Sequence, residues 1–243
     1  MTTNHPLGHL KITDGDTAAA IKQVDEWISN RAKAYSIPLN LTKYIVSRDD
    51  KKLTESIMNA DLVIADGVPI KWLAKRAKIS DVHRVTGVDL SEELLKQAAD
   101  KRWRLFFLGA SPENLERAVE RVKQRFDDPI IAGVRDGYFS EEDVSGIIAQ
   151  INEAKPDILF LGLGMPQKEY FLHDHHADMD VPFCITVGGA IDIWADVKKR
   201  TPKAIQALGL EWLVRSIYDL SKARSILRYG GAFLLELLFY RRA

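Results

Sequence analysis

An α/β fold built on a mostly parallel, Rossmann-like β-sheet is the fold class that the sequence predicts, and two observations lead to it. The first is that short apolar runs recur along the chain, each followed by an amphipathic segment with helical spacing. These runs cover residues 61–67, 104–110, 129–134, 157–164 and 183–189. Consecutive parallel strands need a long crossover, usually a helix, so this alternation favours a parallel sheet flanked by helices.

The second observation is that two of the amphipathic segments begin with helix-start signals. Ser111 stands at an N-cap position with Pro112 at the first helical position, and apolar residues then recur with helical spacing as far as Phe126. Ser140 starts the next segment in the same way, with Asp143 in its acidic first turn. Both segments are predicted to be crossover helices.

The length of the chain allows one large domain with an appendage, because 243 residues with 46% hydrophobic content can bury a sizeable core. We expect a Rossmann-like catalytic domain over residues 1–196 and a basic helical C-terminal appendage over residues 197–243, since a basic, proline-containing break begins at Lys198. Lys plus Arg equal Asp plus Glu at 34 each, so the overall charge gives no reason to expect a nucleic-acid partner.

The single cysteine and the amino terminus both indicate a cytoplasmic protein. Cys184 lies within an apolar run, which predicts a packed core thiol, excludes an internal disulfide and fits a reducing compartment. The amino terminus lacks the basic start and apolar stretch of a secretory signal. No apolar run approaches the roughly 20 residues that span a bilayer.

The last part of the chain is strongly basic. Residues 198–243 contain ten Lys and Arg against three Asp and Glu, whereas the chain as a whole has no net charge. Residues 229–243 form an apolar, aromatic segment with two arginines near its end, which is too short to span a bilayer but typical of an interfacial anchor on an anionic membrane surface. Packing of this segment onto the body or onto a partner subunit is the alternative, which leaves room for a homo-oligomer.

Glycines follow two of the apolar runs directly and precede helix starts, at Gly109 with Ser111 and at Gly188 with Gly189. At the carboxyl edge of a parallel sheet, backbone N–H groups in such loops point at anions, so the two loops together suggest a phosphate-bearing ligand. Each loop alone is also an ordinary strand-to-helix turn. The glycine pattern "GLGMPQ" from Gly162 lacks the third glycine of a dinucleotide fingerprint, so an NAD site is poorly supported.

Asp66 stands where an apolar run ends and a helix is expected to begin. A carboxylate at that place could serve as a general base, but position alone favours an Asp-Gly turn that caps the next helix. The spacing of His173, His175 and His176 spreads them around a helix, so we expect no metal site there. Trp194 and Trp212 are expected to be core or interface aromatics.

Seven segments of the chain together resemble one known family. The segments "NADLVIADGVPI", "RVTGVDL", "FFLGASPENLERA", "DGYF", "PDILFLGLGMPQKE", "VGGAIDIWADVKKRTP" and "LGLEWLVR" occur in the order and spacing of the WecG/TagA/CpsF glycosyltransferases, glycosyltransferase family 26. The likeness covers nearly the whole chain. It implies a Rossmann-like fold and an inverting transfer of a sugar from a UDP-sugar to a polyprenyl-diphosphate-linked sugar, in cell-surface polysaccharide or teichoic-acid synthesis on the inner membrane face, with no metal or other cofactor.

The resemblance assigns roles to residues that the spacing alone leaves open. Asp66 matches the proposed catalytic base of the family, and Asn40 matches the active-site asparagine that follows the second strand. The family commonly has Thr two residues before that asparagine, where this chain has Pro38, which removes a hydroxyl group from the expected site. Arg84 matches a position near the donor, and Asp192 matches one near the uracil and ribose.

Two further groups of residues are implied to bind substrate. Gln167 and Lys168 match the family loop Gly-x-Pro-Lys/Arg-Gln-Glu with the middle pair exchanged, so either one could take the role of the usual glutamine. If the helix begins at Pro166, this exchange rotates the amide by about 100° around the helix axis. In the C-terminal appendage, arginines of the family are thought to reach over the active site, and the matching residues are Arg215, Arg224 and Arg228.

Departure of UDP without a metal requires that preorganised N–H groups and cationic side chains stabilise its negative charge. Residues 109–111 with Gly188 and Gly189 can supply the N–H groups, and the basic appendage can supply the cations. Two alternatives stay open from the sequence. One is a non-catalytic module on the same fold that binds lipid or a partner protein, and the other is a nucleotide-dependent oxidoreductase.

Overall fold

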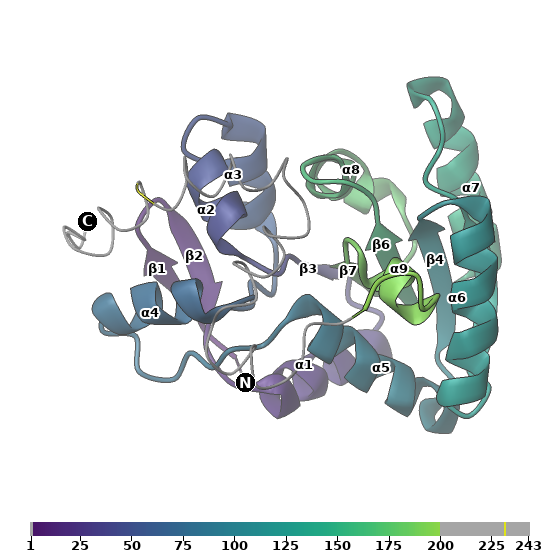
Figure 1. The fold of residues 1–243 in the computed structure, drawn as a ribbon, viewed down its shortest axis with the longest axis horizontal. Helices are drawn as coiled ribbons and strands as arrows, with labels where there is room; N and C mark the ends of the chain where they lie inside the picture. Colours follow the sequence, from purple (N-terminus) through teal and green to yellow (C-terminus); the bar gives the residue numbers. More distant parts are fainter. Residues whose placement is uncertain (1, 200–230, 232–243) are drawn as a thin grey trace.

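The computed structural model describes residues 2–199 and 231, and its main sheet has five strands (Figure 1). Each neighbouring pair in this sheet is parallel. The strands, in spatial order, are β3 (Ala34–Ser36), β7 (Phe183–Thr186), β6 (Ile158–Gly162), β4 (Arg104–Gly109) and β5 (Ile130–Arg135). The predicted parallel sheet is therefore confirmed, and four of the five apolar runs contain its strands.

Helices cover both faces of the sheet, because its strands are apolar on both sides. Leu105 and Phe107 of β4 belong to one buried cluster, whereas Phe106 and Leu108 belong to the other. The helices that pack in the first cluster are α1 (Thr17–Ser29), α5 (Gly87–Lys101), α6 (Pro112–Arg125) and α9 (Ala190–Trp194). Those in the second are α2 (Leu41–Val46), α3 (Lys51–Asn59), α4 (Val68–Arg76), α7 (Val144–Ala154) and α8 (Gln167–His175).

The predicted helix starts are confirmed. The Ser111 hydroxyl accepts a hydrogen bond from the backbone N–H of Asn114, so it caps α6. The Asp143 carboxylate accepts hydrogen bonds from the backbone N–H and the hydroxyl of Ser140. The first turn after Ser140 is a 3-10 turn, Glu141–Asp143, and α7 continues from it.

Residues 62–65 of the apolar run 61–67 are buried, but the run is not a regular strand, which differs from the prediction. It makes single parallel bridges, of Leu62 with Ser36 and of Ala65 with Leu39, instead of a continuous ladder. On the side that faces β2, the N–H of Val63 donates to the hydroxyl of Thr13, 2.8 Å away, so a side chain takes the place of a backbone acceptor there.

An antiparallel hairpin of β1 (Asn4–Leu7) and β2 (Leu10–Thr13) precedes α1, and the sequence did not predict it. Its buried residues Leu7, Leu10 and Ile12 join the cluster that contains α3 and α4. The predicted boundary at residue 196 follows shortly after α9, and almost all of the predicted appendage lies outside the described residues. Within the described part of the chain, every helix falls short of the length and apolar character that crossing a bilayer requires.

Candidate active site

The carboxyl edge of the sheet has a topological switch point between β4 and β6. From β4 the chain passes through α6 on one face to reach β5, and from β6 it passes through α8 on the other face to reach β7. In open α/β sheets the crevice outside such a pair of strand ends is where ligands bind. Gly109 ends β4 and Gly162 ends β6, and the two are register partners.

The approach of these two strand ends requires glycine at Gly109. Its φ is +137°, and a Cβ atom there would lie 2.5 Å from the carbonyl carbon of Gly162. The next turn leads to Ser111 and the N-terminus of α6, whose unsatisfied N–H groups and dipole favour an anion. The predicted phosphate loop at residues 109–111 therefore lies at the switch point.

The second glycine loop lies beside the first. The carbonyl oxygen of Gly188 is 3.3 Å from the position that a Cβ of Gly162 would take. Asp192, in α9, accepts a hydrogen bond of 3.0 Å from the side-chain amide of Asn114 in α6 and pairs with the ammonium of Lys198. The structure thus brings Gly109, Ser111, Gly188, Gly189 and Asp192 to one end of the sheet.

Backbone bridges and hydrogen bonds join the segments that contain Asn40, Asp66 and Arg84, although 44 positions separate the first residue from the last. Ala65 bridges to both Leu39 and Arg84, and the N–H of Asp66 donates to the carbonyl of Leu39 at 2.9 Å. Asn40 is the N-cap of α2, where its side-chain oxygen accepts from the N–H of Lys43 at 3.0 Å. Gly67, not Asp66, occupies the N-cap position of α4.

A buried charge cluster lies between these two groups of residues, and it consists of Lys43, Glu169 and Lys168. Their exposed fractions are 4%, 0% and 5%. The Lys43 ammonium lies 2.9 Å from Oε1 of Glu169 and donates to the Pro38 carbonyl at 2.7 Å. The Lys168 ammonium lies 3.4 Å from the same Glu169 oxygen. Two cations and one carboxylate leave this buried cluster with an excess positive charge, which favours an anionic ligand beside it.

Lys168 extends from this cluster to the second glycine loop. Its Cε lies 3.9 Å from the position that a Cβ of Gly188 would take. Burial and the neighbouring Lys43 lower the pKa of Lys168 to about 8, while Glu169 opposes that change. Through Glu169 and Lys43, Lys168 therefore links the segment before Asn40 to the loop that is predicted to hold phosphate.

The exchange of Gln167 with Lys168 has a clear structural consequence. Helix α8 begins at Gln167, one residue later than the expected start at Pro166. Gln167 is exposed, and its amide oxygen lies near Gly164, whereas Lys168 is buried. The side chain within the cluster is thus the lysine at position 168, and the amide of Gln167 lies outside it.

Sequence reasoning missed Lys43 and did not predict that Glu169 is buried. Glu169 is in fact fully buried and holds both lysines. The only sequence signal for Lys43 is a single charge within the otherwise uncharged helix "LTKYIV".

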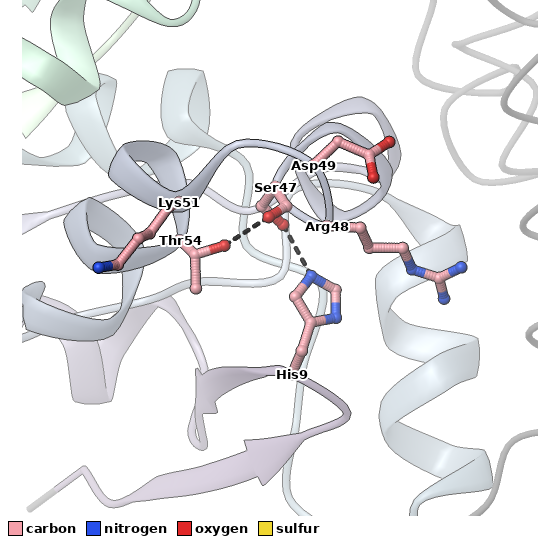
Figure 2. A pocket seen from close by; sticks show the side chains of 6 residues that line it. All are labelled: His9, Ser47, Arg48, Asp49, Lys51 and Thr54. Atoms are coloured by element: carbon pink, nitrogen blue, oxygen red, sulfur yellow. Dashed lines mark hydrogen bonds between the residues drawn. The ribbon is translucent and has the colours of Figure 1, made fainter.

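A separate cavity of about 500 Å³ lies away from these residues (Figure 2). It forms at the C-terminal end of α2, where a ring nitrogen of His9 is 2.8 Å from the hydroxyl of Ser47. Asn40 caps the opposite end of that helix. The residues that line the cavity are His9, Ser47, Arg48, Asp49, Lys51 and Thr54.

Two of the remaining predicted residues, Trp194 and Cys184, lie in the core. Trp194 packs against Phe107 and Phe160 in the core, as expected. Cys184 is buried in β7, and burial raises the pKa of its thiol. Arg215, Arg224, Arg228 and Trp212 lie outside the described residues.

The three neighbouring histidines have different surroundings. His173 lies 3.9 Å from a Glu55 oxygen, His175 packs on Phe171, and His176 packs on Tyr35. In residues 2–199 and 231, no group of three or more His, Cys, Asp or Glu is placed to hold a metal ion.

A doubly wound sheet with two glycine loops at its switch point defines the class of α/β proteins that bind ligands at the carboxyl edge of the sheet. Comparison with known proteins gives the family. A family model described as the glycosyl transferase WecG/TagA/CpsF family matches residues 6–243, and the chain belongs to this family.

Two curated relatives come from two strains of Staphylococcus aureus, and each is named N-acetylglucosaminyldiphosphoundecaprenol N-acetyl-beta-D-mannosaminyltransferase. Each is 32% identical to this chain over 165 residues, which is 68% of this chain. The match spans 64% of the length of each relative.

Proposed function

We propose that the protein is an inverting glycosyltransferase that moves a sugar from a UDP-sugar to a polyprenyl-diphosphate-linked sugar in cell-surface polysaccharide synthesis. Family membership supports the transferase class, and the names of the relatives support a lipid-linked acceptor. The observation that carries the proposal is that contacts link two groups of predicted site residues. The segments that bear Asn40, Asp66 and Arg84 meet beside β3, and Lys43 and Lys168 connect that region to the glycine loops.

In the proposed reaction, Asp66 removes the proton of the acceptor hydroxyl as its oxygen attacks the anomeric carbon of the donor. The new bond joins the acceptor oxygen to that carbon, the bond to UDP breaks on the opposite face, and UDP leaves with the electron pair. Attack opposite the leaving group inverts the configuration. Asn40 orients the acceptor, and Arg84 lies on the donor side.

The negative charge that develops on UDP is stabilised by groups already in place. N–H groups of residues 109–111 and of Gly188 and Gly189 point to the diphosphate, and Lys168 supplies a cation beside Gly188. Asp192 lies on the uracil and ribose side. Arg215, Arg224 and Arg228 of the appendage add cations over the site, and the basic appendage holds the enzyme on the inner face of the cell membrane.

The first test is UDP release from a panel of UDP-sugars, with a synthetic polyprenyl-diphosphate-linked N-acetylglucosamine in liposomes as acceptor. The donors are UDP-linked N-acetylmannosamine, its uronic acid, glucose and glucuronic acid. We expect acceptor-dependent release with one donor and a loss of at least about 100-fold in Asp66→Asn, since a general base contributes roughly that much or more.

The matched control is Asp25→Asn, which changes the same group on α1, where the Asp25 carboxylate pairs with Lys101. This variant should keep the wild-type rate. Release that survives Asp66→Asn would overturn the assignment of the base, and release with none of the donors would contradict the proposed reaction.

A further inference from the structure

Helix α4 begins two residues after Asp66, and one of its faces is exposed, aromatic and basic. Trp72 has an exposed fraction of 48%, and Lys71, Lys75 and Arg76 are exposed beside it. Residues three and four apart share a face of a helix, so Lys75 and Arg76 flank Trp72 directly. Lys78, just after the helix, is also exposed.

The opposite face of α4 fixes this orientation. Ile70, Leu73 and Ala74 are each 0% exposed and pack in the cluster that includes the β1 and β2 hairpin. Turning the helix to bury Trp72 would expose these apolar side chains, at a cost that rises with the apolar area. The tryptophan is therefore held at the surface of α4, a helix that lies at one side of the molecule near the hairpin (Figure 1).

The charged residues of this face are all positive. Residues 67–80 contain four Lys and Arg and no Asp or Glu. Within the described part of the chain, none of these four cations forms an ion pair, whereas Lys52, Lys96 and Lys101 each pair with a carboxylate. A partner that is both apolar and anionic matches an exposed tryptophan among unpaired cations.

We propose that the exposed face of α4, formed by Lys71, Trp72, Lys75, Arg76 and Lys78, docks onto an anionic lipid surface. Tryptophan rings favour the boundary between headgroups and acyl chains, and lysine and arginine are attracted to anionic headgroups. A second copy of the chain fits this face poorly, because a two-fold contact would place these cations against their own copies.

The consequence for the reaction rests on the proposed function. Because α4 starts beside Asp66, docking through α4 holds the candidate base close to the headgroup layer, where the diphosphate of a lipid-linked acceptor lies. The surface belongs to the body of the protein and acts in addition to the basic appendage.

The test measures partition of the full-length protein onto vesicles of equal parts phosphatidylglycerol and phosphatidylcholine, with no donor or acceptor present. Each cation near an anionic surface contributes about fivefold to affinity, so Lys75→Glu with Arg76→Glu should lower partition by at least about tenfold. Trp72→Ser should lower it by about fivefold, because apolar contact with the interface is lost.

The matched control is Arg117→Glu with Lys123→Glu, which makes the same charge change at exposed positions on α6. It should stay within about twofold of wild type. Equal losses in the two double variants, or no loss in the α4 variants, would overturn the proposal. So would a Trp72→Ser protein that binds vesicles normally but changes its oligomeric state in sedimentation. All substitutions are at exposed positions, and thermal unfolding checks that each variant folds.

The two proposals fail in different ways. Vesicle binding needs no turnover, so it can be measured whether or not the protein is an active transferase. If the wild type has no transferase activity but binds vesicles, and the α4 variants lose that binding, the proposed reaction is contradicted and the docking surface is supported. If α4 docks the active enzyme, the charge variant should lose transfer to acceptor in liposomes while keeping transfer to a short-chain acceptor in solution. A variant that keeps both transfers at wild-type rates would contradict docking through α4.

Discussion

Glu169 shows how a single carboxylate permits two lysines to be buried. A buried ammonium without a partner is costly, and Glu169 accepts contacts from Lys43 and Lys168 on the same oxygen. The cluster still has one positive charge in excess, so it is best satisfied when an anion binds beside it. A diphosphate near Gly188 would complete the charge balance that the protein leaves open.

The lowered pKa of Lys168, about 8, gives a pH dependence with a definite sign. Lys168 is protonated below pH 8 and becomes neutral above it, so the affinity for UDP should fall as pH rises through that value. The expected loss is about tenfold, because a charge-assisted contact to phosphate is replaced by a neutral one. Calorimetric titration of UDP on either side of pH 8 measures it.

Lys168→Met is the control for this dependence. It should bind UDP more weakly than wild type at neutral pH and show a flat profile over the same range. An identical profile in the two proteins would mean that another group controls the affinity.

At the scale of elements, the helix starts and four of the strands follow from local sequence, because caps and apolar runs act on their nearest neighbours. Ser111 and Ser140 cap where the sequence predicts. The run 61–67 is predicted to be a strand, but it makes only single bridges, and these join it to segments that are distant in sequence. The β1 and β2 hairpin also gains its stability from a core built by later segments.

The contact between the ends of β4 and β6 predicts different outcomes for two glycines. Gly109→Ala adds a Cβ 2.5 Å from the backbone of Gly162 at a φ of +137°, so it should lower the free energy of unfolding by about 3 kcal/mol or more, or prevent folding. Gly146→Ala in α7 meets no atom within 4 Å and should raise the free energy of unfolding by roughly 0.5–1 kcal/mol. Urea unfolding measures both.

The comparison of these two variants separates steric conflict from general intolerance of substitution. Gly109→Ala with wild-type stability would show that the strand ends do not approach as described. A loss of stability in Gly146→Ala would contradict the position of Gly146 within an exposed helical turn.

At the scale of the molecule, the residues of both apolar clusters in the described part of the chain all precede Lys198. Removal of residues 198–243 should therefore leave the body folded, with its near-UV circular dichroism retained. It should abolish transfer to a lipid-linked acceptor, because the basic appendage and its arginines are lost. Full activity of the truncated protein would overturn the proposed role of the appendage.

The sequence by itself determined the α/β class, the two glycine loops after the strands and, through its resemblance to a family, Asp66 and Asn40 as candidates. The fold class and the loops follow from local signals, namely the spacing of apolar residues, the positions of glycines and the helix caps. The candidate residues follow from the order of the family motifs. Only the tertiary structure decided that Lys43 and Lys168 share Glu169, that Gln167 points outward, and that Trp72 stays at the surface. Burial and pairing of charges depend on which segments pack together, and that is set by the whole fold.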